Sequence, residues 1–287
     1  MNIITRFPEE NELCILYNIW KTVFGESGMD AFFRHYYSPQ MCIVAEHDSK
    51  PAAAGYLVPF GDFVYSGETL PCGMIYSIAT LPEYRGKGLG AAVVNRLISL
   101  AFENDYPVVV LCPSESGLYK YYESKTKMKE FFYANEIIIK SKDIQTNLNT
   151  EVLNKLSGTE YKNRRDMLLT GKTHISQNIK TFEYQSLLNK EVGGGFYSLD
   201  DCLILIERES NKTVHIKELL TTAHEYNMQT IIKIIASIKK DFPADEYIIR
   251  FPTNNQKNNK FGMLISRDEN IIINTHDLLP WYGIPFD

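Results

Sequence analysis

The sequence contains no long hydrophobic run and no apolar leader. No stretch of its 287 residues approaches the roughly 18–20 apolar residues of a membrane-spanning helix. Residues 1–12 contain Arg6 followed by acidic side chains, and they lack the apolar core of a secretory signal. We therefore expect a cytoplasmic protein that makes no contact with a membrane.

Cysteine and histidine are sparse, and neither residue type forms a recognisable site. The five cysteines include no C-x-x-C pair, so we expect free thiols in a reducing compartment. The six histidines show neither H-x-x-x-H nor H-E-x-x-H spacing, so we expect no metal site. The sequence also lacks the G-x-S-x-G turn of serine hydrolases and the G-x-x-x-x-G-K-[ST] loop of nucleotide triphosphatases.

An excess of positive charge is absent as well. The chain has 30 Lys and Arg residues against 35 Asp and Glu residues, a formal net charge of −5. Non-specific nucleic-acid binding needs a positive field, so we expect no nucleic-acid partner. Hydrophobic residues make up 44% of the chain, which is enough for a substantial core, and the length suggests about two domains.

Helical and strand patterns alternate along the first half of the chain. Apolar residues at helical spacing predict helices over residues 9–24, 29–37 and 91–104, and a further helix capped at 113–114 that runs through 122. Apolar runs predict strands over residues 41–46, 51–58, 73–80, 107–112 and 131–139. This pattern indicates an α/β fold, with a single polar residue, Ser77, interrupting the third strand.

The second half repeats this order after a polar segment at residues 141–150. Helices are predicted over residues 151–169, 175–188 and 223–241. Strands are predicted over residues 196–199, 202–207, 213–220, 246–251, 263–265 and 271–273. Two paired strands, a third strand, a long helix and a fourth strand follow one another as in residues 41–112, which favours a tandem duplication of one α/β fold.

The strongest chemical signal is the segment I-A-T-L-P-E-Y-R-G-K-G-L-G at residues 78–90. A predicted strand leads through a glycine-rich loop into a helix, whose first amides have no internal partner and attract anions. The spacing is not the G-x-G-x-x-G of dinucleotide-binding folds. We expect a diphosphate here. The expected cofactor-binding residues are Ile78, Ala79, Thr80, Arg85, Gly86, Lys87, Gly88, Leu89 and Gly90.

Residues 81–90 resemble the acetyl-CoA signature R/Q-x-x-G-x-G/A of the GNAT N-acetyltransferase superfamily, with Arg85, Gly88 and Gly90 at its three fixed places. The order of predicted elements in residues 1–140 is similar to that family as well. The resemblance implies a central, mixed, mostly antiparallel sheet flanked by helices. It also implies that acetyl-CoA is the co-substrate and that the acceptor is a primary amine of a small molecule or peptide.

A second landmark lies at residues 118–123, where L-Y-K-Y-Y-E resembles the family segment L-x-x-F-Y-E. Tyr122 falls at the tyrosine that many members use to protonate the departing thiolate. The sequence departs from the family pattern after Glu123, so Tyr119 and Tyr121 stay alternatives for this acid. The resemblance further implies that a backbone N–H near Ile78 faces the thioester oxygen. For the general base, Glu46, Glu68, Glu115, the chain end at Asp287 and a water relay stay open.

More local similarities, at residues 24–27, 32–37 and 111–116, resemble a two-domain subgroup related to the enhanced-intracellular-survival acetyltransferases. They imply a catalytic GNAT domain at residues 1–140 and a degenerate GNAT-like domain at residues 150–287. No glycine occurs at residues 221–226, which correspond to the glycine loop, so we expect one cofactor site per chain.

Two other functions are compatible with such a tandem fold. Tandem-GNAT aminoacyl transferases use aminoacyl-tRNA and usually lack a good CoA loop, so the segment from Arg85 to Gly90 argues against them. The second is an acyl-CoA-binding sensor or adaptor without catalytic activity, which the altered segment after Glu123 allows. The sequence specifies neither the amine acceptor nor an oligomeric state.

Overall fold

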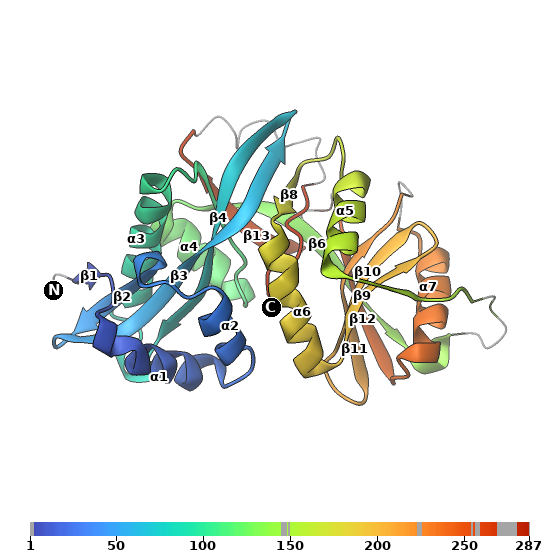
Figure 1. Cartoon of the computed structure of the whole chain (residues 1–287), viewed down its shortest axis with the longest axis horizontal. Coiled ribbons are helices and arrows are strands. Elements are labelled where there is room, and N and C mark those ends of the chain that lie inside the picture. The colour runs from blue at the N-terminus through green and yellow to red at the C-terminus, as the bar shows by residue number, and fades with distance from the viewer. Residues whose placement is uncertain are drawn as a thin grey trace. The chain divides into compact units, whose positions relative to one another are not determined.

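The computed structural model describes residues 3–144, 148, 150–222, 226–253, 255, 259–268 and 280–286. The chain divides into two compact units (Figure 1). Unit 1 comprises Met1–Val64, Glu68–Phe131 and Phe261–Asp277, and unit 2 comprises Tyr65–Gly67, Phe132–Lys260 and Leu278–Asp287. The strand predicted at residues 271–273 and the candidate base Asp287 lie outside the described residues.

Unit 1 is built on a mixed sheet with the strand order β1-β2-β3-β4-β5-β13. These strands are β1 (Thr5–Arg6), β2 (Cys42–His47), β3 (Lys50–Tyr65), β4 (Glu68–Thr80), β5 (Val108–Leu111) and β13 (Lys260–Ser266). The pairs β1–β2, β2–β3 and β5–β13 are antiparallel, whereas β4–β5 is parallel. A parallel pair needs a crossover connection, which α3 (Leu89–Glu103) supplies.

Helices cover both faces of the unit 1 sheet. On one face, α1 (Leu13–Phe24) and α2 (Met29–His35) pack through aromatic side chains, with Trp20 stacked 4.9 Å from Phe32 and 6.0 Å from Tyr56 of β3. On the other face, α3 and α4 (Ser116–Thr126) form an aliphatic core that includes Val93 and Leu97. Successive residues of β3 therefore face opposite sides of the sheet: Gly55 lies under α3, whereas Tyr56 points to the aromatic cluster.

Unit 2 has a second mixed sheet with the strand order β6-β12-β11-β10-β9-β7. Its strands are β6 (Lys129–Lys140), β7 (Asn154–Leu156), β9 (Gly195–Leu199), β10 (Cys202–Arg208), β11 (Thr213–Leu220) and β12 (Glu246–Pro252). The short β8 (His174–Gln177) forms an isolated bridge from His174 to Trp281. Its helices are α5 (Gly158–Leu168), α6 (Ile179–Val192) and α7 (Met228–Asp241).

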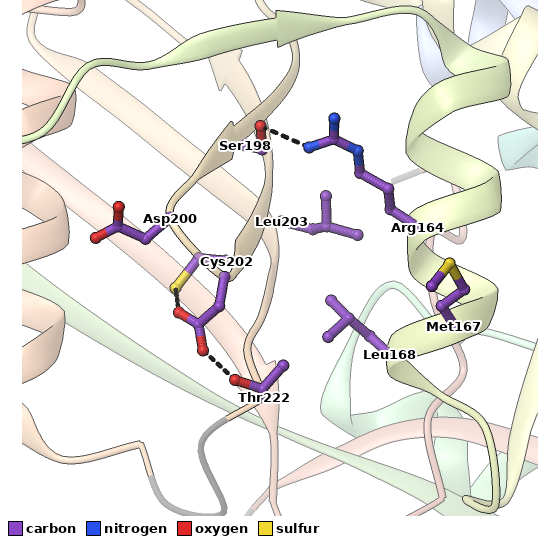
Figure 2. A pocket seen from close by; sticks show the side chains of 9 residues that line it. Arg164, Met167, Leu168, Ser198, Asp200, Cys202, Leu203 and Thr222 are labelled. Atoms are coloured by element: carbon purple, nitrogen blue, oxygen red, sulfur yellow. Dashed lines mark hydrogen bonds between the residues drawn. The ribbon is translucent and has the colours of Figure 1, made fainter.

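Alternating side chains of β10 separate the two layers of helices in unit 2. Ile204 and Ile206 pack into a cluster with the isoleucines of α7, including Ile235, whereas Leu203 faces α5 (Figures 1 and 2). The order β9, β10, β11, α7 and β12 matches that of β2, β3, β4, α3 and β5, including the parallel last pair. The α/β fold class and its mixed, helix-flanked sheets are therefore as predicted.

Besides the short turn Tyr65–Gly67, which belongs to unit 2, the compact units differ from the predicted domains of residues 1–140 and 150–287 in two places. The second part of β6 pairs with β12, with Ala134 opposite Pro252 and Lys140 opposite Glu246, so it completes the sheet of unit 2. Strand β13 returns to unit 1, where it lies beside β5. Both differences arise from ladders between residues far apart in the sequence, which local hydrophobic patterns do not encode.

The three helices of unit 2 begin later than predicted because the chain places caps inside the predicted ranges. Residues 175–177, predicted as helix, lie in β8, and Asn178 accepts from the amide of Thr181 and caps α6. Ser157 accepts from the amide of Glu160 and caps α5, so residues 151–156 lie outside the helix and include β7. Asn227 accepts from the amide of Thr230 and caps α7. Within the described ranges, no helix is long and apolar enough to cross a membrane.

A fully buried ion pair lies in unit 2. Arg165 of α5 and Glu218 of β11 are both 0% exposed, and Arg165 Nε donates to Glu218 at 3.1 Å. The same carboxylate accepts hydrogen bonds from Tyr161 Oη at 2.8 Å and from Trp281 Nε1 at 2.5 Å. Glu218 therefore connects α5, β11 and the segment around Trp281.

Candidate active site

Strands β4 and β5 run together for only a short distance. Their parallel ladder ends where Met74 lies opposite Val110, whereas β4 continues to Thr80. Among the described residues, no other strand pairs with this edge of β4 beyond Met74. The backbone of residues 75–80 is therefore available on that side to an extended, peptide-like ligand.

A bulge at Ser77 reverses the side chains of β4 at this point. Ser77 has a left-handed φ of 49°. Before it, the ring of Tyr76 lies 6.0 Å from Trp20 on the aromatic face. After it, Ile78 lies on the α3 face of the sheet. Its Cδ1 would be 2.3 Å from a Cβ built on Gly55, which lies under α3. Residues 76 and 78 of a regular strand share a face, so the bulge turns the strand where its ladder with β5 has ended.

The loop after β4 ends in backbone conformations that favour glycine. The amide of Arg85 still donates to the carbonyl of Pro82 at 3.2 Å and closes a short turn. Gly86 and Gly88 then have φ values of 78° and 85°, which side chains with a Cβ rarely adopt. A Cβ built on Gly86 would meet nothing within 4 Å, so the loop faces open space there.

A row of amide groups without acceptors follows in the same loop. Gly88 is the N-cap of α3 and supplies no side-chain cap, and the first helical bond runs from the Ala92 amide to the Gly88 carbonyl at 3.1 Å. In the part of the chain that the structure describes, the amides from Gly86 to Gly90 donate no hydrogen bond. Such amides at a helix N-terminus form a site for an anion.

Basic side chains lie beside these amides. Lys87 Nζ is 3.1 Å from His47 Nε2 and 5.0 Å from the centre of the Tyr84 ring. Arg85 folds back, so that its Nε donates to the carbonyl of Thr80 at 3.3 Å. Their positive charge adds to the field of the α3 N-terminus.

Tyr121 of α4 contacts the start of α3. A Cβ built on Gly90 would lie 3.7 Å from its hydroxyl oxygen, and the backbone amide of Ala91 is close enough to influence that hydroxyl. Burial raises the pKa of Tyr121, and the Ala91 amide opposes part of that shift. Tyr121 therefore lies at the edge of the amide row, a position that its place in the sequence did not indicate.

Tyr122 lies deeper, in the core between α3 and α4. It is 7% exposed, and its ring is 5.4 Å from that of Tyr121. Burial, with a smaller contribution from Tyr121, raises the pKa of Tyr122 to about 12, so the phenol is protonated at neutral pH. Tyr122 is part of the hydrophobic cluster against which Ile78 packs. Tyr119 is also buried there.

Residues 5–124 match the family model described as "Acetyltransferase (GNAT) domain". This chain carries a GNAT acetyltransferase domain. The matched region contains the open edge of β4, the glycine loop and nearly all of α4. Acyl transfer is therefore the class of reaction that the domain supports.

Three solved structures resemble this chain over more than nine-tenths of its length. A GCN5-related N-acetyltransferase from Anabaena variabilis has a TM-score of 0.69 at 15% identity, over 93% of this chain and 73% of that one. Eis1 from Mycobacterium abscessus has a TM-score of 0.58 at 11% identity, over 92% of this chain and 74% of that one. A tandem GNAT protein from the clavulanic acid biosynthesis pathway has a TM-score of 0.55 at 9% identity, over 93% of this chain and 98% of that one. At these identities the likeness shows the fold. No curated protein matched the sequence.

The GNAT domain presents few carboxylates suited to act as a base. Glu46 is engaged by Arg6, whose Nε lies 2.6 Å from Glu46 Oε1. Arg6 also forms an ion pair with Glu12 at 2.7 Å. The hydrogen bond from Arg6 is the main reason why the pKa of the Glu12 carboxyl is lowered. Ion pairing favours the charged form and weakens a base. The other two candidates, Glu68 and Glu115, are exposed.

The predicted cofactor residues of the GNAT domain lie on consecutive elements: Ile78, Ala79 and Thr80 end β4, residues 85–88 form the loop, and Leu89 and Gly90 begin α3. The sequence interpretation missed the bulge at Ser77 and the contact of Tyr121 with Ala91. Only Ser77, a polar residue inside the predicted strand, indicated the first of these.

Proposed function

We propose that the protein is an acetyl-CoA-dependent N-acetyltransferase of the cytoplasm that transfers an acetyl group to a primary amine of a small molecule or peptide. One observation carries this proposal. The unpaired amides from Gly86 to Gly90 adjoin the end of β4, whose backbone is open beyond Met74. An anion site beside an open strand edge fits a molecule that joins a diphosphate to a peptide-like arm.

The residues present fit acetyl-CoA, which would supply an activated thioester. The amides of the loop and the side chains of Arg85 and Lys87 would hold its diphosphate. The free edge of residues 75–80 would pair with the amides of its pantetheine arm. An N–H near Ile78 would then donate to the thioester oxygen, and such a donor contributes about 3–4 kcal/mol to transition-state stabilisation.

Tyr122 would act as the general acid in this proposal. Its raised pKa keeps the phenolic proton in place at neutral pH, and it is part of the cluster against which Ile78 packs. No protein nucleophile is needed, because a neutral amine attacks the thioester directly. Since the Tyr121 hydroxyl lies beside Gly90 at the start of α3, it would line the cofactor site rather than protonate sulfur.

We expect Gly86→Glu to weaken CoA binding at least about tenfold, because a carboxylate would then lie beside the diphosphate. Isothermal titration calorimetry with CoA measures this directly. Gly171→Glu is a matched control: Gly171 has a φ of 76° against 78° for Gly86, and a Cβ at either position meets nothing within 4 Å. The control, which lies in unit 2, should bind CoA like the unaltered protein. Normal CoA binding by Gly86→Glu would refute the assignment of the loop.

A further inference from the structure

A pocket of about 200 Å³ opens in unit 2, between α5 and the hairpin of β9 and β10 (Figure 2). Arg164 and Leu168 of α5 line one side, and Asp200, Asp201 and Leu203 of the hairpin line the other. Drug-sized ligands generally occupy pockets of roughly 300–1,000 Å³, so this volume restricts the occupant to a smaller molecule.

Arg164 offers positive charge at one end of the pocket. Its Nη1 donates to Ser198 Oγ at 3.1 Å, and this is its one hydrogen bond within the described residues. A guanidinium carries five N–H donors in a planar fork, so several are left for a ligand, and the fork matches a carboxylate.

Two carboxylates at the other end of the pocket differ in their surroundings. Asp201 accepts hydrogen bonds from the hydroxyls of Thr222 and Thr221, and chiefly the Thr222 bond holds the pKa of Asp201 below its usual range. Asp200 is exposed at the turn and forms no hydrogen bond or ion pair in the part of the chain that is described. One carboxylate is therefore fixed and ionised, and the other is available to a ligand.

An apolar surface separates these charges. Figure 2 shows Leu203 between Arg164 and Asp200, with Leu168 and Met167 on the α5 side. Met167 is 77% exposed, so an occupant would cover apolar surface that now faces water. Arg164 and Asp200 form no ion pair with each other in the described structure, which leaves both charges to a ligand that reaches across.

The corresponding turn of unit 1 has no excess of negative charge, because Asp48 is accompanied there by Lys50. There, the turn between β2 and β3 brings His47 to within 3.1 Å of Lys87 in the glycine loop. In unit 2, the turn between β9 and β10 carries Asp200 and Asp201, and Asp201 bonds to Thr222 of the loop after β11. Two carboxylates repel a phosphate and attract an ammonium group, so this pocket is not a second CoA site.

We propose that the pocket of unit 2 binds a small zwitterion whose ammonium and carboxylate are separated by a short apolar chain, as in an ω-amino acid. The carboxylate would pair with Arg164, and the ammonium with Asp200 and Asp201. The methylene groups would lie on Leu168 and Leu203. This site is independent of acetyl transfer in unit 1.

Calorimetric titration of the full chain with 4-aminobutyrate, 5-aminovalerate and 6-aminohexanoate tests the proposal. Pentylamine and pentanoate, which each carry one of the two charges, serve as reference ligands. At least one zwitterion should bind about tenfold more tightly than both, because each charge-assisted contact is expected to contribute a factor of that order. Absence of zwitterion binding up to about 50 mM, or equal binding of a singly charged ligand, would overturn it.

Two variants assign the binding to this pocket. Asp200→Asn and Arg164→Gln should each reduce zwitterion affinity to that of the matching singly charged ligand. Asn tolerates the φ of 49° at position 200, so the turn should be retained, which circular dichroism checks. Asp48→Asn is the matched control, since Asp48 occupies the turn of β2 and β3 with a φ of 51°. Unchanged affinity in Asp200→Asn would refute the site.

Discussion

Tyr122→Phe should lower the rate of acetyl transfer by about a hundredfold or more while CoA affinity stays within about twofold, because general acid catalysis contributes factors of this size. The substitution removes one hydroxyl from a side chain that is 7% exposed, so the ring packing is retained. Thiol release from acetyl-CoA, followed with a panel of polyamines, aminoglycosides and lysine peptides, measures the rate. Since burial raises the pKa of Tyr122 to about 12, the acid should lose its proton only well above neutral pH.

Tyr119→Phe provides the control, because Tyr119 lies on the same helix and is similarly buried at 4% exposure. It should lose some stability and keep most of its activity. Equal activity of Tyr122→Phe and the unaltered protein would show that another group protonates the sulfur. Tight CoA binding without thiol release from the unaltered protein, across the whole amine panel, would favour a sensor over an enzyme.

Glu218→Gln should reduce the free energy of unfolding of unit 2 by about 3–5 kcal/mol, the usual result of leaving one member of a buried ion pair without its partner. Arg165 and Glu218 have no exposed side-chain surface, so water cannot solvate the guanidinium after the substitution. The donors of Tyr161 and Trp281 would also lose the charged acceptor that they share. Removal of that acceptor weakens contacts between three segments at once.

Urea unfolding followed by circular dichroism measures this change, and the fluorescence of Trp281 reports the same region. Glu103→Gln is the matched control, because Glu103 pairs with Arg96 at 2.9 Å on the surface, with 56% of its side chain exposed. Exposed ion pairs contribute little to stability, so the control should unfold at nearly the same urea concentration as the unaltered protein. If the two variants lost equal stability, the buried pair would not have the role assigned to it.

The glycine loop and the fold class were predictable from the sequence because both rest on local patterns. Alternation of apolar runs and helical stripes along residues 41–112 is enough to place strands and a crossover helix. Gly86 and Gly88 occupy positions with positive φ, the conformation that glycine adopts most readily. The helix itself begins at Leu89, two residues before the predicted start at residue 91.

Contacts between distant residues explain what the sequence did not indicate. The ladder of β13 with β5 joins Leu264 to Val110, and no local pattern encodes that pairing. The position of the Tyr121 hydroxyl beside Gly90 likewise depends on how α4 lies against the start of α3. The separation of β4 from β5 after Met74 requires knowledge of both strands. These long-range contacts define the shape of the site, whereas the local motif defines its chemistry.

The position of β13 late in the chain affects the order in which the two sheets can be completed during translation. Strand β13 completes the sheet of unit 1 beside β5, yet it is translated after β12, the last strand to be made in unit 2. Until it emerges, the nascent chain exposes an unpaired edge of β5, a known template for aggregation. Unit 1, although most of it is synthesised first, therefore cannot complete its sheet until β13 has emerged.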